Sequence, residues 1–281
     1  MNLSGDSNST LHSSDTVQLL YVQNLIYYVA NVINVILSLP ANAYVLWLIV
    51  TGPKGTVASD LFGLNLAVTE ILSSLSSLGF IIYYYQDSEA VYNFALFFKG
   101  FIYYGRSPFQ SCICVERYLA VIHPVTFLKY KPVRYRMGCS GVVWMLVIGT
   151  CIGYMFSNAT PAWKSYALSF ILVQFLVMLF CCQAVLRALK HPGPVDGEGE
   201  GTNHIKQRAF KIISTILVFA VVMYLPRLLL LLSFNFIDSV KFYFALCVCF
   251  LITVIFGFLQ PVLYLHRAGK LPCIGTLLGK S

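Results

Sequence analysis

The chain has 281 residues, of which 58% are hydrophobic and only 11% are charged. Soluble domains carry about 25% charged residues, so this composition excludes a soluble protein and indicates one embedded in a membrane. The net charge of +8 is typical of many nucleic-acid-binding proteins, but the basic residues lie at positions that argue against such a function.

Seven apolar stretches are long enough to cross a bilayer, which takes about 20 helical residues. The predicted fold is an all-α membrane protein, a seven-transmembrane helix bundle at 25–265, with an extracellular tail at 1–24 and a cytoplasmic tail at 266–281. The polar N-terminal segment has no apolar core typical of a signal peptide, so we expect the first span to act as its own insertion signal. The spans are expected near 25–50, 58–82, 94–118, 138–156, 166–189, 209–234 and 242–265.

The distribution of lysine and arginine predicts the orientation, because these residues accumulate on the cytoplasmic side. With the N-terminus outside, the outer segments contain only Lys164 and Lys241. This asymmetry also explains most of the net charge as topology and attraction to anionic lipid. The inner segments contain Lys54, Lys129, Lys131, Arg134, Arg136, Arg187, Lys190, Lys206, Arg208, Lys211, Arg267, Lys270 and Lys280.

Charged residues inside a membrane are costly and usually functional. The third span carries Lys99, Arg106 and Arg117, whose spacings of about two and three helical turns predict one shared face toward the bundle interior. Glu70 in the second span and Arg106 lie at similar depths, roughly 16–18 Å from the inner membrane edge at 1.5 Å per residue. We therefore predict a buried salt bridge between them, although Arg106 hydrated without a partner is the alternative.

Two further cations are expected in the outer half of the bundle, Lys99 and Arg227, with no acidic partner at their depth inside the membrane. With Tyr103 and Tyr224 they would form a pocket for an anionic small ligand, such as a carboxylate, a phosphate or an acidic lipid. Structural pairing with acidic residues at the outer rim is an equally open alternative. Those residues are Asp87, Glu89 and Asp238.

A series of short motifs resembles the rhodopsin-like G-protein-coupled receptors over nearly the whole chain. The motif Glu116-Arg117-Tyr118 lies in the run CICVERYLAVIHP, which begins at Cys112. The other matches are Asn42, the segment Asn65-Leu-Ala-Val-Thr-Glu70, Trp144, the segment Met223-Tyr-Leu-Pro226 and the segment Gln260-Pro261-Val-Leu-Tyr264. The run at the third span is most similar to the branch that senses nucleotides, hydroxy acids, lysolipids and proteases.

The resemblance implies a plasma-membrane receptor that activates heterotrimeric G proteins by outward movement of the inner helix ends. Arg117 would contact the G protein, and Glu116 would hold Arg117 in the resting state. Pro226 and Pro261 each remove a helix hydrogen bond, so they are expected to kink the sixth and seventh helices and let the inner halves move. The other predicted switch residues are Tyr118 and Tyr264. A buried polar network is expected to consist of Asn42, Glu70, Arg106 and Gln260.

This chain also departs from the family pattern. Tyr92 stands where the family has a cysteine at the top of the third helix, and the segment 157–165 has no cysteine, so the family's outer disulfide is not expected. Lys206 and Arg208 stand where the family often has an acidic residue. Our hypothesis is that this difference raises basal activity. No cysteine or histidine spacing suggests a metal site, and no cofactor is implied.

Several modification sites are predicted from local sequence. Asn2, Asn8 and Asn158 are acceptors for glycosylation, and Cys273 is a candidate for palmitoylation, with an ordinary thiol as the alternative. We expect the loop 191–207 to be flexible and the segment 267–278 to form a short amphipathic helix on the inner surface.

Other function classes fit the sequence less well. A transporter would usually show internal repeats, and a membrane enzyme would need a nucleophile with a base nearby, neither of which is found. A retinal protein is excluded because the seventh span has no lysine in its interior. A membrane transporter and a signalling-silent receptor-like protein are the alternatives that we keep.

Overall fold

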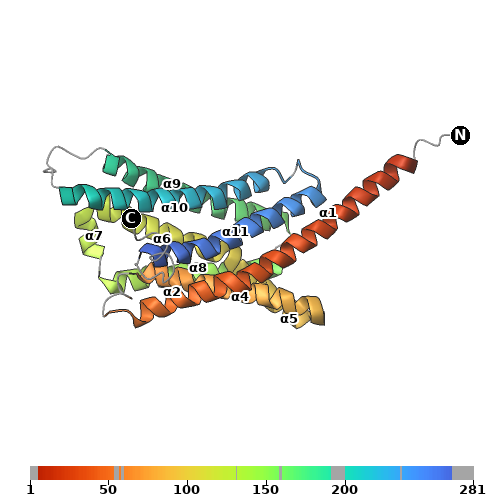
Figure 1. Cartoon of the computed structure of the whole chain (residues 1–281), viewed down its shortest axis with the longest axis horizontal. Coiled ribbons are helices and arrows are strands. Elements are labelled where there is room, and N and C mark those ends of the chain that lie inside the picture. The colour runs from red at the N-terminus through yellow and green to blue at the C-terminus, as the bar shows by residue number, and fades with distance from the viewer. Residues whose placement is uncertain are drawn as a thin grey trace, which may run out of the picture.

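The structure is a computed structural model, and it describes residues 6–53, 57, 60–130, 132–157, 160–190, 200–234 and 236–267. All regular elements in these residues are helices. Long helices lie side by side along the longest axis of the molecule, and α1 projects beyond the bundle toward the N-terminus (Figure 1). This arrangement confirms the predicted all-α membrane helix bundle.

The first, second and third membrane helices come from several elements. The first consists of α1 (Asp6–Ile33), the π-helical turn η1 (Asn34–Ser38) and α2 (Leu39–Thr51). The second is α4 (Leu61–Gln86), and the third consists of α5 (Glu89–Gly100), the π-helical turn η2 (Phe101–Gly105) and α6 (Arg106–Ile122). Asp87 has a φ of 41°, and this left-handed residue ends α4 and makes room for a short connection to α5.

The remaining helices follow in the expected order. A short helix, α7 (Pro124–Tyr130), connects α6 to α8 (Val133–Ser157). Then follow α9 (Pro161–Lys190), α10 (Glu200–Leu232) and α11 (Ser239–Arg267). We call the end of the bundle with α7 the inner end, as the basic residues predict, and the end with the α4–α5 connection the outer end.

Two differences from the predicted elements concern helix length. The first helix begins at Asp6, so most of the predicted polar tail is helical. Similarly, α10 begins at Glu200, so the segment 200–207, expected to be flexible, is also helical. The predicted amphipathic segment 267–278 lies outside the described residues except for its first residue.

Six of the described helical segments are long and apolar enough to cross a membrane: Thr16–Thr51, Leu61–Gln86, Val133–Ser157, Pro161–Lys190, Ile213–Leu232 and Ser239–His266. The composite helix α5–η2–α6, which carries Lys99, Arg106 and Arg117, is not among them. Its position between α4, α8 and α9 nevertheless makes it the centre of the bundle, because α5 packs on α4 and α8, and α6 on α9.

Both π-helical turns have a cause in the sequence. Proline has no backbone N–H, so it leaves the carbonyl four residues before it without its helical partner. Pro40 therefore deprives the carbonyl of Ile36, in η1, of its helical donor. Pro108 does the same to the carbonyl of Tyr104, in η2. A π-helical turn adds a residue to the helix and changes the face that the preceding segment presents.

Close contacts between small residues hold the outer half of the bundle together. A Cβ atom added to Gly100 would lie 2.7 Å from the sulfur of Cys151, and one added to Gly79 would lie 2.9 Å from the Cβ of Ala95. Helices in membranes often pack through such small residues, because the backbones can then approach closely. These contacts fix α5 between α4 and α8 and so position the charged residues that follow.

Candidate functional site

A cavity of about 380 Å³ opens in the outer half of the bundle. Its size falls within the range of pockets that bind small molecules. It is lined by residues of α1, α5, η2, α8, α9, α10 and α11, and three cations are among them. The charged, polar and aromatic lining residues are Gln23, Asn24, Tyr27, Tyr92, Lys99, Tyr103, Tyr104, Tyr154, Trp163, Lys164, Arg227, Phe242, Tyr243 and Phe250.

Aromatic rings stabilise the cations of this outer cavity. The Nζ atom of Lys99 lies 4.9 Å from the ring centroids of both Tyr27 and Phe80. The guanidinium carbon of Arg227 lies 4.1 Å from the ring centroid of Tyr103, and Nζ of Lys99 lies 6.0 Å from the same centroid. Attraction to a ring face offsets part of the cost of burying a cation, but it leaves the positive charge in place.

Within the described part of the chain, no carboxylate balances these cations. No aspartate or glutamate lines the outer cavity, and among the described residues none lies within ion-pair distance of Lys99 or Arg227. The alternative of pairing with Asp87, Glu89 or Asp238 is therefore wrong for this structure. The outer cavity is thus a positively charged, aromatic site suited to an anion.

The sequence placed Lys99, Tyr103 and Arg227 correctly in one cavity, but Tyr224 does not line it. The hydroxyl of Tyr224 instead donates to Oε1 of Gln110 at 3.2 Å, deeper in the bundle. Sequence reasoning also missed Lys164, whose Nζ atom lies 3.4 Å from the ring centroid of Phe234. Its place among the few basic residues of the outer segments was the signal that could have identified it.

Below the outer cavity, Arg106 and Glu70 form a buried ion pair, as the sequence predicted. Nε of Arg106 donates to Oε1 of Glu70, and the two residues are only 4% and 8% exposed. The guanidinium also lies 3.3 Å from the sulfur of Met223 and 3.5 Å from the carbonyl oxygen of Thr253. Arg106 therefore connects α4, α6, α10 and α11.

Gly257 of α11 makes room for this ion pair. A Cβ atom at that position would lie 2.8 Å from Nη2 of Arg106 and 3.2 Å from Oε2 of Glu70. Pro261 leaves the carbonyl of Gly257 without its helical donor, and the side chain of Asn42 lies 3.5 Å from that oxygen. The proline of the seventh membrane helix thus has a second effect, since it frees an acceptor for the polar network.

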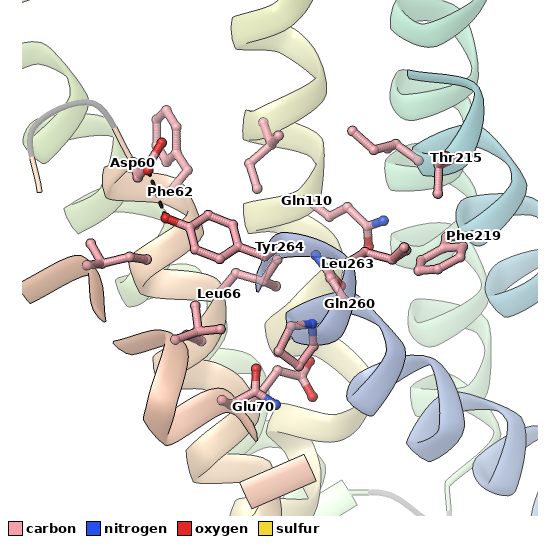
Figure 2. A pocket seen from close by; sticks show the side chains of 18 of the residues that line it. Asp60, Phe62, Leu66, Glu70, Gln110, Thr215, Phe219, Gln260, Leu263 and Tyr264 are labelled. Atoms are coloured by element: carbon pink, nitrogen blue, oxygen red, sulfur yellow. Dashed lines mark hydrogen bonds between the residues drawn. The ribbon is translucent and has the colours of Figure 1, made fainter. Parts of the chain in front are cut away.

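A second cavity, of about 180 Å³, lies in the inner half of the bundle. Gln110 and Gln260 point into it, and Glu70 lies at its deep end (Figure 2). The hydroxyl of Tyr264 donates to Oδ2 of Asp60 at 3.0 Å, which joins the inner parts of α11 and α4. Arg117 also lines this inner cavity and is exposed.

The predicted pairing of Glu116 with Arg117 is wrong for this structure. Glu116 of α6 forms its ion pair with Arg136 of α8, and the guanidinium of Arg136 also lies 5.9 Å from the ring centroid of Phe62. Both residues line the inner cavity, but consecutive helical residues point in different directions, so the carboxylate of Glu116 reaches α8 whereas Arg117 does not pair with it. Tyr118 follows a third direction and packs against Phe180 of α9.

The three cations of the third membrane helix all face cavities inside the bundle. Lys99 lines the outer cavity, Arg106 the ion-pair region and Arg117 the inner cavity. The turn η2 lies between Lys99 and Arg106, so the simple 3.6-residue period that predicted a single face does not describe this segment. Pro226 and Pro261 lie inside α10 and α11, as expected.

The predicted modification sites cannot be placed in the structure. Asn2, Asn158 and Cys273, together with the side chain of Asn8, lie outside the part of the chain that the structure describes. The same is true of the side chains of Lys206 and Arg208, on which the hypothesis of raised basal activity was built.

Comparison with known proteins agrees with this architecture. Residues 41–162 match the family described as 7 transmembrane receptor (rhodopsin family). The chain is 21% identical to the uracil nucleotide/cysteinyl leukotriene receptor of Mus musculus, over 79% of this chain and 70% of that receptor. It is 24% identical to a purinoceptor of Gallus gallus, over 50% of this chain and 48% of that receptor. It is 26% identical to C-C chemokine receptor type 8 of Homo sapiens, over 68% of this chain and 58% of that receptor.

Proposed function

Because this chain belongs to the rhodopsin family of seven-transmembrane receptors, we propose that it binds an extracellular anionic small molecule and activates a heterotrimeric G protein. The chain is a multi-pass protein of the plasma membrane and a receptor, not an enzyme. The N-terminus lies outside in this proposal, so that the outer cavity faces the extracellular side.

One observation carries the proposed ligand chemistry. Lys99, Lys164 and Arg227 line one cavity, and no carboxylate of the described residues balances them there. Uncompensated cations in a pocket of low dielectric attract an anion strongly, and a guanidinium can bind a carboxylate or phosphate through two hydrogen bonds. The ligand would exchange part of the ring contacts of Lys99 and Arg227 for direct ion pairs.

The position of Tyr103 adds a geometric limit. Its ring lies 6.0 Å from Nζ of Lys99 and 4.1 Å from the guanidinium carbon of Arg227, so the two cations are no farther apart than the sum of these distances. A small ligand with two acidic groups can therefore contact both cations at once. The aromatic residues around them would hold the apolar body of the ligand.

The inner cavity supplies the proposed output. Arg117 lines it without a carboxylate partner among the described residues, next to Tyr264 and Gln260. Pro226 and Pro261 lie inside α10 and α11, and outward movement of the inner parts of these two helices would widen this cavity for a helix of the G protein. Arg117 would then contact that helix directly.

The test is nucleotide exchange on purified G proteins by membranes that contain this chain, with pools of anionic metabolites added. We expect exchange that Arg117→Ala abolishes, and a metabolite response that Lys99→Met and Arg227→Met weaken at least about tenfold, as loss of a charge-assisted hydrogen bond predicts. Lys241→Gln is the matched control, because Lys241 is an exposed outer cation that does not line the cavity.

Two outcomes would contradict the proposal. A response that persists in Lys99→Met and Arg227→Met would place the ligand elsewhere. Absence of exchange with every G protein, at normal surface expression, would favour a signalling-silent receptor-like protein and reopen the transport alternative.

A further inference from the structure

A small third cavity lies between the outer cavity and the buried ion pair. It has a volume of about 10 Å³, which is room for one particle of the size of water. Arg106, Ser107, Met223, Arg227 and Thr253 are among its lining residues. We call it the arginine cavity, because guanidinium groups from α6 and α10 both line it.

Two buried polar atoms at the arginine cavity have no hydrogen-bond partner. They are Oγ of Ser107 and Nε of Arg227, and Ser107 is only 1% exposed. Buried polar groups in proteins are nearly always paired, and an unpaired one is strongly destabilising. Two such atoms on residues that line one cavity indicate a common partner that is not part of the chain.

The charges around the arginine cavity indicate the nature of that partner. Glu70 balances Arg106 through their ion pair, but no carboxylate lines the cavity or, among the described residues, lies within ion-pair distance of Arg227. The local charge is therefore positive by one unit. The carbonyl of Thr253, one of the few acceptors here, already lies near Arg106, so hydrogen-bond donors outnumber free acceptors.

We propose that the arginine cavity is a halide site, occupied by one chloride ion between the Nε–H of Arg227 and the hydroxyl of Ser107. A single anion would neutralise the excess charge and satisfy both unpartnered donors. Carboxylate and phosphate groups are too large for about 10 Å³, whereas a single halide is closer to water in size, and the flexible thioether of Met223 can move to admit the larger ion.

This site is distinct from the proposed ligand pocket, and it does not depend on the proposed function. The two share Tyr103 and Arg227, which line both the arginine cavity and the outer cavity. Chloride below Arg227 and an anionic ligand above it would therefore compete for the same positive charge. The concentration of chloride would then set how strongly the outer cavity attracts its ligand.

The test is the line width of the ³⁵Cl NMR signal of sodium chloride with the purified full-length chain in detergent, with bromide as competitor and gluconate as control anion. We expect line broadening that bromide reverses and gluconate does not. Ser107→Ala and Arg227→Gln should weaken chloride binding by about tenfold each, because each removes a donor to the ion.

Three control variants separate this site from other cations and serines. Lys99→Met and Lys164→Gln remove cations of the outer cavity that do not line the arginine cavity, and Ser111→Ala removes a buried serine of the same helix whose hydroxyl lies 3.5 Å from the carbonyl of Gln174. All three should bind chloride like the unchanged chain.

The proposal would be overturned if the unchanged chain gave no broadening, which would leave water as the occupant. Equal loss in Lys99→Met and Lys164→Gln would overturn it too, because chloride would then bind in the outer cavity. Thermal unfolding checks that each variant is folded. If Arg227→Gln does not fold, Ser107→Ala decides alone, and chloride binding unchanged in that variant refutes the site.

Discussion

The ion pair between Glu70 and Arg106 should make each residue dependent on the other. In Glu70→Gln the guanidinium of Arg106, 4% exposed, would keep its charge without a counter-charge, and in Arg106→Met the carboxylate of Glu70 would be left in the same way. Breaking a buried pair by removing one partner costs about 3–5 kcal/mol. At about 2–4 °C per kcal/mol, each variant should melt roughly 10 °C below the unchanged chain.

The double variant Glu70→Gln/Arg106→Met provides the decisive comparison, because it leaves no isolated charge. The stability that the double variant loses should be smaller than the sum of the losses of the two single variants. The difference, the coupling energy, should be about 1–3 kcal/mol. Thermal unfolding can be followed with a thiol-reactive dye, since Cys114, Cys181 and Cys182 are buried and become accessible on unfolding.

Lys99→Met is the matched control for these variants, because Lys99 is an interior cation of the same membrane helix without a carboxylate partner among the described residues. It should not show the loss caused by an orphaned counter-charge. Single variants of the pair that melt within about 2 °C of the unchanged chain would refute the reasoning. So would a double variant whose loss of stability equals the sum of the two single losses. Normal surface expression and activation of Arg106→Ala would count against it as well.

Further variants test the contacts around this pair. Gly257→Ala should lower the melting temperature, because its Cβ would lie 2.8 Å from Arg106, whereas Gly149→Ala, which meets no atom within 4 Å, should not. Tyr264→Phe removes the hydrogen bond to Asp60, so it should destabilise the chain by about 1 kcal/mol and change basal nucleotide exchange; identical exchange would argue against a resting contact. Glu116→Gln should lower stability but leave basal exchange little changed, because Glu116 holds Arg136 and not Arg117; a large rise in exchange would restore the predicted lock.

The sequence predicted the membrane helices and the central ion pair because both depend on regular geometry. The length of an apolar stretch sets a span, and a rise of 1.5 Å per residue sets the depth of a charge along its helix. Glu70 and Arg106 could therefore be matched by depth alone. A charge that deep inside a membrane has few available partners, which made the match specific.

Other features depend on packing that no local pattern contains. The partner of Glu116 could not be predicted, because Arg136 reaches it from α8 and only the helix arrangement brings them together. The lining of the outer cavity was incomplete for a similar reason, since Lys164 belongs to the outer end of α9, which the sequence does not place against α10. Pro40 and Pro108 could have indicated irregular turns, but not their type.

The missing carboxylates account for the arrangement of charge along the bundle. The described interior carries Lys99 and Arg227 at the outer cavity and Arg106 at the centre, but only Glu70 is placed to neutralise any of them. A protein whose only task was to be stable would have replaced the uncompensated cations by apolar residues, because isolated charges in a membrane are costly. Their presence is most simply explained if anions from solution complete the site, a ligand above Arg227 and a halide below it. The stability of this protein should therefore depend on the anions that surround it, and the two proposals share this physical basis although separate experiments test them.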